Sequence, residues 1–174
     1  IDGFVIYGST IGLYVKSQSD QAILQNNVVS NCSGNGIYLQ DSENVVVFNN
    51  LVYNNARTGI LVTGNIDGSA GARILSNTVY QNGNRGIFFS GTTVGSPAGL
   101  VLNNVVQGNA SAGIQVNASS RDGYLSGGNV SFDNRFASGT PVDVTDITGD
   151  PALVNPSGAD GLLGGAGFAD DSFH

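Results

Sequence analysis

The sequence predicts an all-β solenoid, in which a short unit repeats along the chain and its copies stack as coils. The first observation is a recurrent pair, because an Asn is followed nine residues later by a Gly in four places: Asn27–Gly36, Asn50–Gly59, Asn77–Gly86 and Asn104–Gly113. The second is the period. Starting at Gly12, these glycines are 24, 23, 27 and 27 residues apart, which is a solenoid repeat. The third is composition, since 26 Gly and only 11% charged residues favour strands and tight turns over helices.

The first strand of each coil begins at the recurrent Gly. Each is a few residues of apolar sequence with a period of two, which is typical of a short strand. The segments are 12–15, 36–39, 59–62, 86–89 and 113–116, with a sixth candidate at 141–144.

Two more strands complete each coil, one on each side of the recurrent Asn. The strand before it is predicted at 23–24, 45–48, 74–75, 100–102 and 124–125, and the strand after it at 28–29, 51–52, 78–79, 105–106 and 130–131. Three strands per turn, each paired with its equivalent one coil away at about 4.8 Å, form three short parallel sheets around a shared core.

The length variation falls in one turn. The arc from Asn to Gly is constant, whereas the additional residues lie after the first strand, at 63–72, 90–99 and 117–123. A constant arc indicates a packed, hydrogen-bonded structure, and the variable turn is predicted to be a solvent loop.

The recurrent Asn residues are predicted to form a buried ladder: Asn27, Asn50, Asn77, Asn104 and Asn129. Asn tolerates the left-handed backbone that a sharp bend demands, and stacked amides can donate to one another. The preceding column begins at Asn26 and is expected to support this ladder. The column five residues further on (Cys32, Asn55, Asn82, Asn109 and Asn134) is expected to serve the next turn.

The repeat has limits at both ends. Residues 1–11 are interpreted as the end of an earlier coil, residues 1–145 as about five to six coils, and residues 146–174 as an irregular Gly- and Asp-rich tail. Pro151 and Pro156 disfavour continued parallel pairing. Since a solenoid ends in unpaired strand edges, we expect either flanking coils of a longer parent chain or end-to-end self-association.

Charge and cysteine content exclude several function classes. The net charge of −7 and only six dispersed cationic residues disfavour nucleic acid as a partner. No segment approaches a membrane span, so membrane insertion is not expected. Cys32 is the single cysteine and is predicted to be a buried free thiol.

The repeat resembles a known family. The pattern Asn-Asn-x-Val, a second Asn about five residues on, and then Gly-Ile-x-Val is similar to the right-handed parallel β-helix repeat of pectate-lyase-like proteins, over roughly residues 4–145. The resemblance implies that the coils wind in a right-handed direction. It also implies a secreted or cell-surface protein that acts on or binds polysaccharides. The tail from Gly149 is similar to segments that follow such repeats in large bacterial surface proteins.

A candidate ligand-binding face lies on the sheet of first strands, which forms the floor of the substrate groove in the family's enzymes. If these strands alternate, Tyr14, Tyr38, Leu61, Phe88, Gln115 and Asp143 point outward. One strand step further along are Lys16, Gln40, Thr63, Ser90, Asn117 and Thr145. The candidate ligand-binding residues are Tyr14, Tyr38, Phe88, Gln40, Gln115 and Asn117. The alternative is that loops or the tail cover the aromatic side chains.

No catalytic residue can be assigned. The family's hydrolases need two or three close carboxylates, and this sheet offers Asp143 alone. Its lyases need Ca²⁺ on clustered Asp with an Arg or Lys. Arg57, Arg85, Asp41 and Glu43 are more simply interpreted as solvated surface charges. No cofactor is predicted apart from a candidate Ca²⁺, whose oxygen ligands would be Asp146, Asp150, Asp170 and Asp171.

The function hypotheses follow from these observations. The first is a non-catalytic extracellular module, carbohydrate-binding or surface-structural, cut from a larger secreted protein. The second is a polysaccharide lyase, hydrolase or epimerase acting over the sheet of first strands. The third is a structural spacer or assembly rod.

Overall fold

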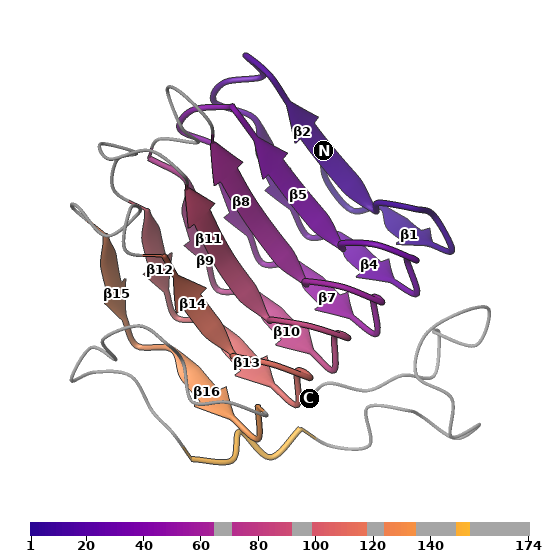
Figure 1. The fold of residues 1–174 in the computed structure, drawn as a ribbon, viewed down its shortest axis with the longest axis vertical. Helices are drawn as coiled ribbons and strands as arrows, with labels where there is room; N and C mark the ends of the chain where they lie inside the picture. The colour runs from indigo at the N-terminus through magenta and orange to yellow at the C-terminus, as the bar shows by residue number, and fades with distance from the viewer. Residues whose placement is uncertain (65–70, 92–98, 118–123, 135–148, 154–174) are drawn as a thin grey trace.

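The computed structural model describes residues 1–64, 71–91, 99–117, 124–134 and 149–153. Every regular element in these ranges is a β-strand, and strands recur in threes after the first (Figure 1). None of the described segments forms a helix long and apolar enough to cross a membrane.

Three parallel sheets run along the rod, and each strand pairs with its equivalent one coil away (Figure 1). The six-stranded sheet contains β1 (Val5–Tyr7), β4 (Val28–Ser30), β7 (Leu51–Tyr53), β10 (Thr78–Tyr80), β13 (Val105–Gln107) and β16 (Val130–Phe132). The β2 sheet contains β2 (Leu13–Lys16), β5 (Ile37–Gln40), β8 (Ile60–Gly64), β11 (Ile87–Gly91) and β14 (Ile114–Val116). The β3 sheet contains β3 (Ile23–Gln25), β6 (Val46–Phe48), β9 (Arg73–Leu75), β12 (Leu100–Leu102) and β15 (Leu125–Gly127).

These strands confirm the all-β fold, the three sheets and the position of the predicted strands. β1 pairs with β4, so the first residues do complete an earlier coil. The sixth candidate first strand, 141–144, and the outward position given to Asp143 lie outside the described residues. So does most of the predicted tail.

The core is a set of apolar columns, because equivalent residues lie in register. Val29, Val52, Val79 and Val106 pair one above another in the six-stranded sheet and are fully buried. In the β2 sheet inward and outward residues alternate, as the period of two predicts. Burying each such aliphatic side chain stabilises the fold by about 1.5–3 kcal/mol.

Two sharp corners join the sheets in every coil. The first corner leads from the β3 sheet into the six-stranded sheet, at Asn26–Asn27 in the first complete coil. The second leads from the six-stranded sheet into the β2 sheet, at residues 31–36. Both lie in the constant arc, whereas the variable turn follows the β2 sheet.

The left-handed residues lie one position before the place that the sequence suggested. Asn26, Asn49, Ser76 and Asn103 have φ values of 56°, 53°, 52° and 57°. The expectation that Asn27 and its equivalents adopt the left-handed backbone is wrong. Asn26 bends the chain, and its neighbour Asn27 turns its amide into the core.

Candidate functional site

The predicted ladder fills the first corner. Asn27, Asn50, Asn77, Asn104 and Asn129 are at most 2% exposed. Asn50 donates from its backbone N and from Nδ2 to Asn77 Oδ1, over 2.9 and 3.0 Å, and the same pair of bonds links Asn77 to Asn104. The ladder thus satisfies buried backbone and side-chain groups without water.

A second ladder fills the second corner, as expected for the column five residues further on. Asn55 donates to Asn82 Oδ1, Asn82 to Asn109 Oδ1, and Asn109 to Asn134 Oδ1. Cys32 occupies the first place in this column. Its backbone N donates to Asn55 Oδ1 over 3.0 Å, and its thiol is buried and free, as predicted.

Outside each ladder runs a row of solvent-facing amides whose bonds point the other way. Asn49 Nδ2 donates back to Asn26 Oδ1 at 2.8 Å, and Asn26 Nδ2 donates back to Asp2 Oδ1 at 2.8 Å. At the second corner, Asn54 Nδ2 donates back to Asn31 Oδ1 at 2.5 Å. The amide-to-amide bonds of the inner ladders therefore run toward the C-terminal end of the rod, and those of the outer rows run toward its N-terminal end.

The candidate ligand-binding face is the outward side of the β2 sheet. Its alternation places Tyr14, Tyr38, Leu61, Phe88 and Gln115 outward, with Gln40 one strand step on. Asn117 follows β14, and its backbone N donates to Phe89 O at 3.0 Å. The face does not bring the six candidates together at one point. Five of them fall into two clusters, and Asn117 belongs to neither.

The tyrosine cluster lies at the β2 edge. The rings of Tyr14 and Tyr38 stack with centroids 4.9 Å apart and an interplanar angle of 5°. Tyr14 donates its hydroxyl to Gln40 Oε1, and Thr63 Oγ1 donates to the Tyr38 hydroxyl at 3.2 Å. The rings therefore stand on the sheet with their faces along the rod axis, and Tyr38 turns one face to Tyr14.

Tyr14 has the more accessible ring of the two, since 43% of the residue is exposed. β2 is the edge strand of its sheet and pairs only with β5. No strand described here lies on the other side of Tyr14. The free ring face at this edge is a surface on which a planar or pyranose ring can stack.

The arginine cluster lies on β11 and β14. The Arg85 guanidinium carbon is 4.1 Å from the centroid of the Phe88 ring, a cation–π distance. Arg85 also donates from Nε to Gln115 Oε1. Arg85 therefore covers the Phe88 ring, so this ring is not open for stacking.

Sequence reasoning missed one contributor to the face, Arg85, and gave two positions for another, Thr63. Arg85 was interpreted as a solvated charge, although its position one residue before Gly86 places it beside the strand that carries Phe88. Thr63 was expected one strand step beyond Leu61 and also at the start of the variable turn. It lies within β8, which extends to Gly64, and it pairs with Gln40.

Acidic groups are sparse on this face. The outward positions on its described strands carry no carboxylate. Asp41 and Glu43 lie after the end of β5. The backbone N of Glu43 donates to Asp20 Oδ1 in the previous coil at 2.7 Å. Of the Ca²⁺ candidates, Asp150 is described. It is exposed, and its Oδ1 accepts a bond from Ala152 N at 2.8 Å. Asp146, Asp170 and Asp171 lie outside the described residues, within which no group of three His, Cys, Asp or Glu side chains is placed to hold a metal.

Two pKa values are displaced outside the face. Hydrogen bonds from Gln25 and then Asn26 lower the pKa of the Asp2 carboxyl, which is fully exposed. Burial, followed by the charge of Asp133, raises the pKa of the Tyr80 hydroxyl. Neither group lies on the β2 sheet, so neither points to proton transfer there.

Comparison with known proteins gives one match. The family model described as "Right handed beta helix region" matches residues 1–137. No curated protein and no solved structure matches the chain.

Proposed function

Because the chain belongs to the right-handed β-helix family, we propose that it is a non-catalytic module that binds a polysaccharide on the outward face of the β2 sheet. A secreted or cell-surface location is part of this proposal. The observation that carries it is the stacked Tyr14–Tyr38 pair, whose outer ring is exposed at the sheet edge.

The cluster combines the two features that a sugar-binding surface requires. A ring face gives an apolar platform, and the Tyr14 hydroxyl with the Gln40 amide gives donors and acceptors beside it. Lys16 is exposed at the end of the same strand. In this arrangement a sugar ring becomes the next member of the Tyr14–Tyr38 stack, beside the Tyr14 hydroxyl and Lys16, while Gln40 holds the Tyr14 hydroxyl from the β5 side.

The same face favours binding over turnover. Glycoside hydrolysis uses a pair of carboxylates on either side of the bond, and the outward positions of β2, β5, β8, β11 and β14 are aromatic, aliphatic, amide, hydroxyl or cationic. A lyase, hydrolase or epimerase is the alternative outcome of the test below.

The test is a glycan array followed by calorimetry on each polymer that binds, with Tyr14→Ala compared against Tyr7→Ala. Tyr7 is the matched control because it is an exposed Tyr on β1, in another sheet. Removing the platform is expected to weaken binding about fivefold to tenfold, equivalent to about 1–1.4 kcal/mol, and Tyr7→Ala is expected to bind like the wild type.

Each bound polymer is then incubated with the protein, with and without Ca²⁺, and the products are assayed. Binding without new chain ends supports the module. Cleavage, elimination or epimerisation replaces it with the enzyme hypothesis, and turnover that requires Ca²⁺ adds a metal site. Equal losses in the two Tyr variants contradict the assignment of the site to the β2 sheet.

An assembly role is the second candidate, and the apolar N-terminal coil favours it. Among the described residues, six of the seven large apolar side chains that are 43% exposed or more lie on this coil, namely Ile1, Phe4, Val5, Tyr7, Tyr14 and Ile23, and the seventh, Leu125, lies on β15. β1 and β2 each pair with one strand, and such edges attract another strand. The occupant is a second copy or a flanking coil of a longer chain.

Sedimentation at several concentrations tests this second candidate, with Val5→Lys as the variant. A charged residue on the exposed β1 edge is expected to reduce association, and Lys16→Arg, which keeps its charge, serves as the control. A wild type that remains monomeric at high concentration contradicts end-to-end association of copies.

A further inference from the structure

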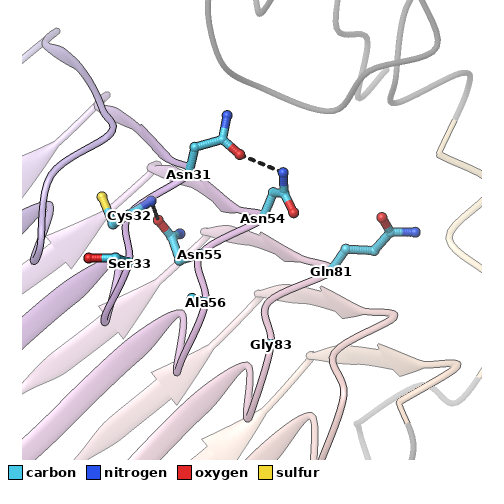
Figure 2. A pocket seen from close by; sticks show the side chains of 8 residues that line it. All are labelled: Asn31, Cys32, Ser33, Asn54, Asn55, Ala56, Gln81 and Gly83. Atoms are coloured by element: carbon cyan, nitrogen blue, oxygen red, sulfur yellow. Dashed lines mark hydrogen bonds between the residues drawn. The ribbon is translucent and has the colours of Figure 1, made fainter.

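A shallow groove of about 350 Å³ runs along the rod at the second corner (Figure 2). Side chains from three successive coils line it. The outer wall is Asn31, Asn54 and Gln81, the inner wall is Ser33, Ala56 and Gly83, and Cys32 and Asn55 lie behind them. We call this feature the amide groove.

Left-handed backbone sets the outer wall. Asn31, Asn54 and Gln81 have φ values of 52°, 51° and 46°, so each coil turns its amide outward at the same point. Figure 2 shows the Asn31 and Asn54 amides joined by a hydrogen bond and the Gln81 side chain extending away from the turn. At about 4.8 Å per coil, the three amides span on the order of 10 Å along the axis.

The groove is uncharged. None of the side chains in its two walls is ionisable, and the thiol of Cys32 is buried behind them. The column continues as Gly108, which has no amide, and then Asp133. Because no cation is present in the walls and an acid follows, the negative charge of a phosphate, a uronate or a nucleic acid has no cationic partner here.

The backbone along the inner wall is already engaged between coils. Ser33 N donates to Ser9 O, Ala56 N to Cys32 O and Gly83 N to Asn55 O, at 2.8–2.9 Å. The groove therefore offers no strand edge to an extended peptide, and it has no apolar pocket for a peptide side chain.

We propose that the amide groove binds a neutral oligosaccharide chain laid along the rod axis. A primary amide carries two donors and an acceptor oxygen with two lone pairs, which suits hydroxyl groups that both give and accept hydrogen bonds. Repetition at one coil spacing suits a polymer that repeats its hydroxyls. This inference does not rest on the proposed function, because the groove lies at the second corner and not on the outward face of the β2 sheet.

The test is NMR titration of ¹⁵N-labelled protein with neutral hexasaccharides, namely β-1,4-glucan, α-1,4-glucan and β-1,4-xylan, and with a hexagalacturonate as the acidic probe. A neutral hexasaccharide is expected to shift the side-chain NH₂ signals of Asn31, Asn54 and Gln81, and the acidic probe is not. Absence of these shifts with every neutral probe overturns the proposal, as does a response to the acidic probe alone or to an unrelated extended peptide.

The variant Asn54→Gly/Gln81→Gly removes two amides at positions where glycine suits the backbone. Its matched control is Asn26→Gly/Asn49→Gly, which removes two exposed amides at the first corner with φ of 56° and 53°. The groove variant is expected to weaken binding at least tenfold, while the control and Tyr14→Ala keep it. An equal loss in the control overturns the proposal.

If the double variant does not fold, Ala56→Trp fills the groove from an exposed position and is expected to abolish the same NMR shifts. Retention of the shifts in Ala56→Trp counts against the groove. Loss of these shifts in Tyr14→Ala would move this ligand to the β2 sheet, so failure here and failure of the proposed function are separable.

Discussion

At both corners of the rod a ladder of buried side chains accepts hydrogen bonds from the backbone, but the two ladders differ in their residues. At the first corner the ladder contains Asn in all five places, from Asn27 to Asn129. At the second corner Cys32 stands in the first place, and a Gly column (Gly36, Gly59, Gly86 and Gly113) lies close to the ladder amides. Cys32 has no side-chain amide, yet its backbone N–H still donates to Asn55 Oδ1 in the next coil. The comparison therefore indicates that the main role of a ladder Asn is to accept the hydrogen bonds of the coil before it.

The largest expected effect is the loss of an interior ladder residue. Asn77→Ala leaves Asn50 N without its acceptor, takes from Asn50 Nδ2 one of its three acceptors, and removes the bonds from Asn77 Nδ2 to Asn104 and Val47. At about 1–3 kcal/mol for each buried polar group left unsatisfied, we expect a loss of about 4 kcal/mol. Urea unfolding followed by circular dichroism measures it.

Asn82→Ala makes the equivalent change at the second corner, and a loss of similar size is expected. If either substitution costs under about 1 kcal/mol, the ladder does not have the role assigned to it.

The next prediction compares the loss of stability caused by one substitution at each corner. A Cβ on residue 59 would lie 2.6 Å from Val79 Cγ1, 2.8 Å from Asn82 Nδ2 and 2.8 Å from Gly86 O. Gly59→Ala is therefore expected to destabilise the protein by about 2–3 kcal/mol through overpacking. At the first corner Asn49→Gly keeps the left-handed backbone, and its effect should stay within about 1 kcal/mol. A thermal unfolding series compares the two, and equal effects would contradict the distinction.

A reciprocal exchange sharpens the comparison further. Asn55→Cys removes the acceptor of Cys32 N and the bond to Asn82, so we expect a loss of about 2 kcal/mol. Cys32→Asn adds an amide where the next coil already fits one, and the change should be within about 1 kcal/mol. If Cys32→Asn proved the more damaging of the two in chemical denaturation, the first place of the second ladder would require sulfur.

The smallest effect concerns the outer row of the first corner, which ends at Asp2. Gln25 Nε2 and Asn26 Nδ2 donate to its carboxylate at 2.9 and 2.8 Å and lower its pKa below 3.8. The native carboxylate therefore adds stability that is present above the unfolded pKa and is lost as pH falls through the native pKa.

Carboxyl NMR titration measures this value, and Gln25→Ala is expected to raise it toward 3.8. No change in that variant would show that Gln25 is not the leading cause.

The sequence was sufficient for the fold because the same choices recur in every coil. The valine columns, the buried Asn and the alternation in the β2 sheet each follow from one period, and all are in the structure. The left-handed position was misplaced by one residue because Asn26 and Asn27 are chemically identical, and only the hydrogen-bond geometry distinguishes the residue that bends the chain.

The site was less predictable, since ring orientation depends on neighbours. The pattern placed Tyr14, Tyr38 and Phe88 outward, but it did not indicate that Tyr38 would stack on Tyr14 or that Arg85 would cover Phe88. The amide groove was also not foreseen. Its residues were interpreted by their ladder neighbours, although the recurrence of Asn31, Asn54 and Gln81 at equivalent points was visible in the sequence.

The opposed directions of the inner ladders and the outer rows have an electrical consequence. In an α-helix the aligned peptide dipoles add up and leave partial charges at the two ends. Here the amide-to-amide bonds of the buried ladders run one way along the axis and those of the solvent-facing rows run the other way, so the two sets of amide dipoles oppose each other where both are present. The opposition is partial, because Ser76 and Gly108 interrupt the outer rows and each buried Nδ2 also donates to a carbonyl of the coil before it.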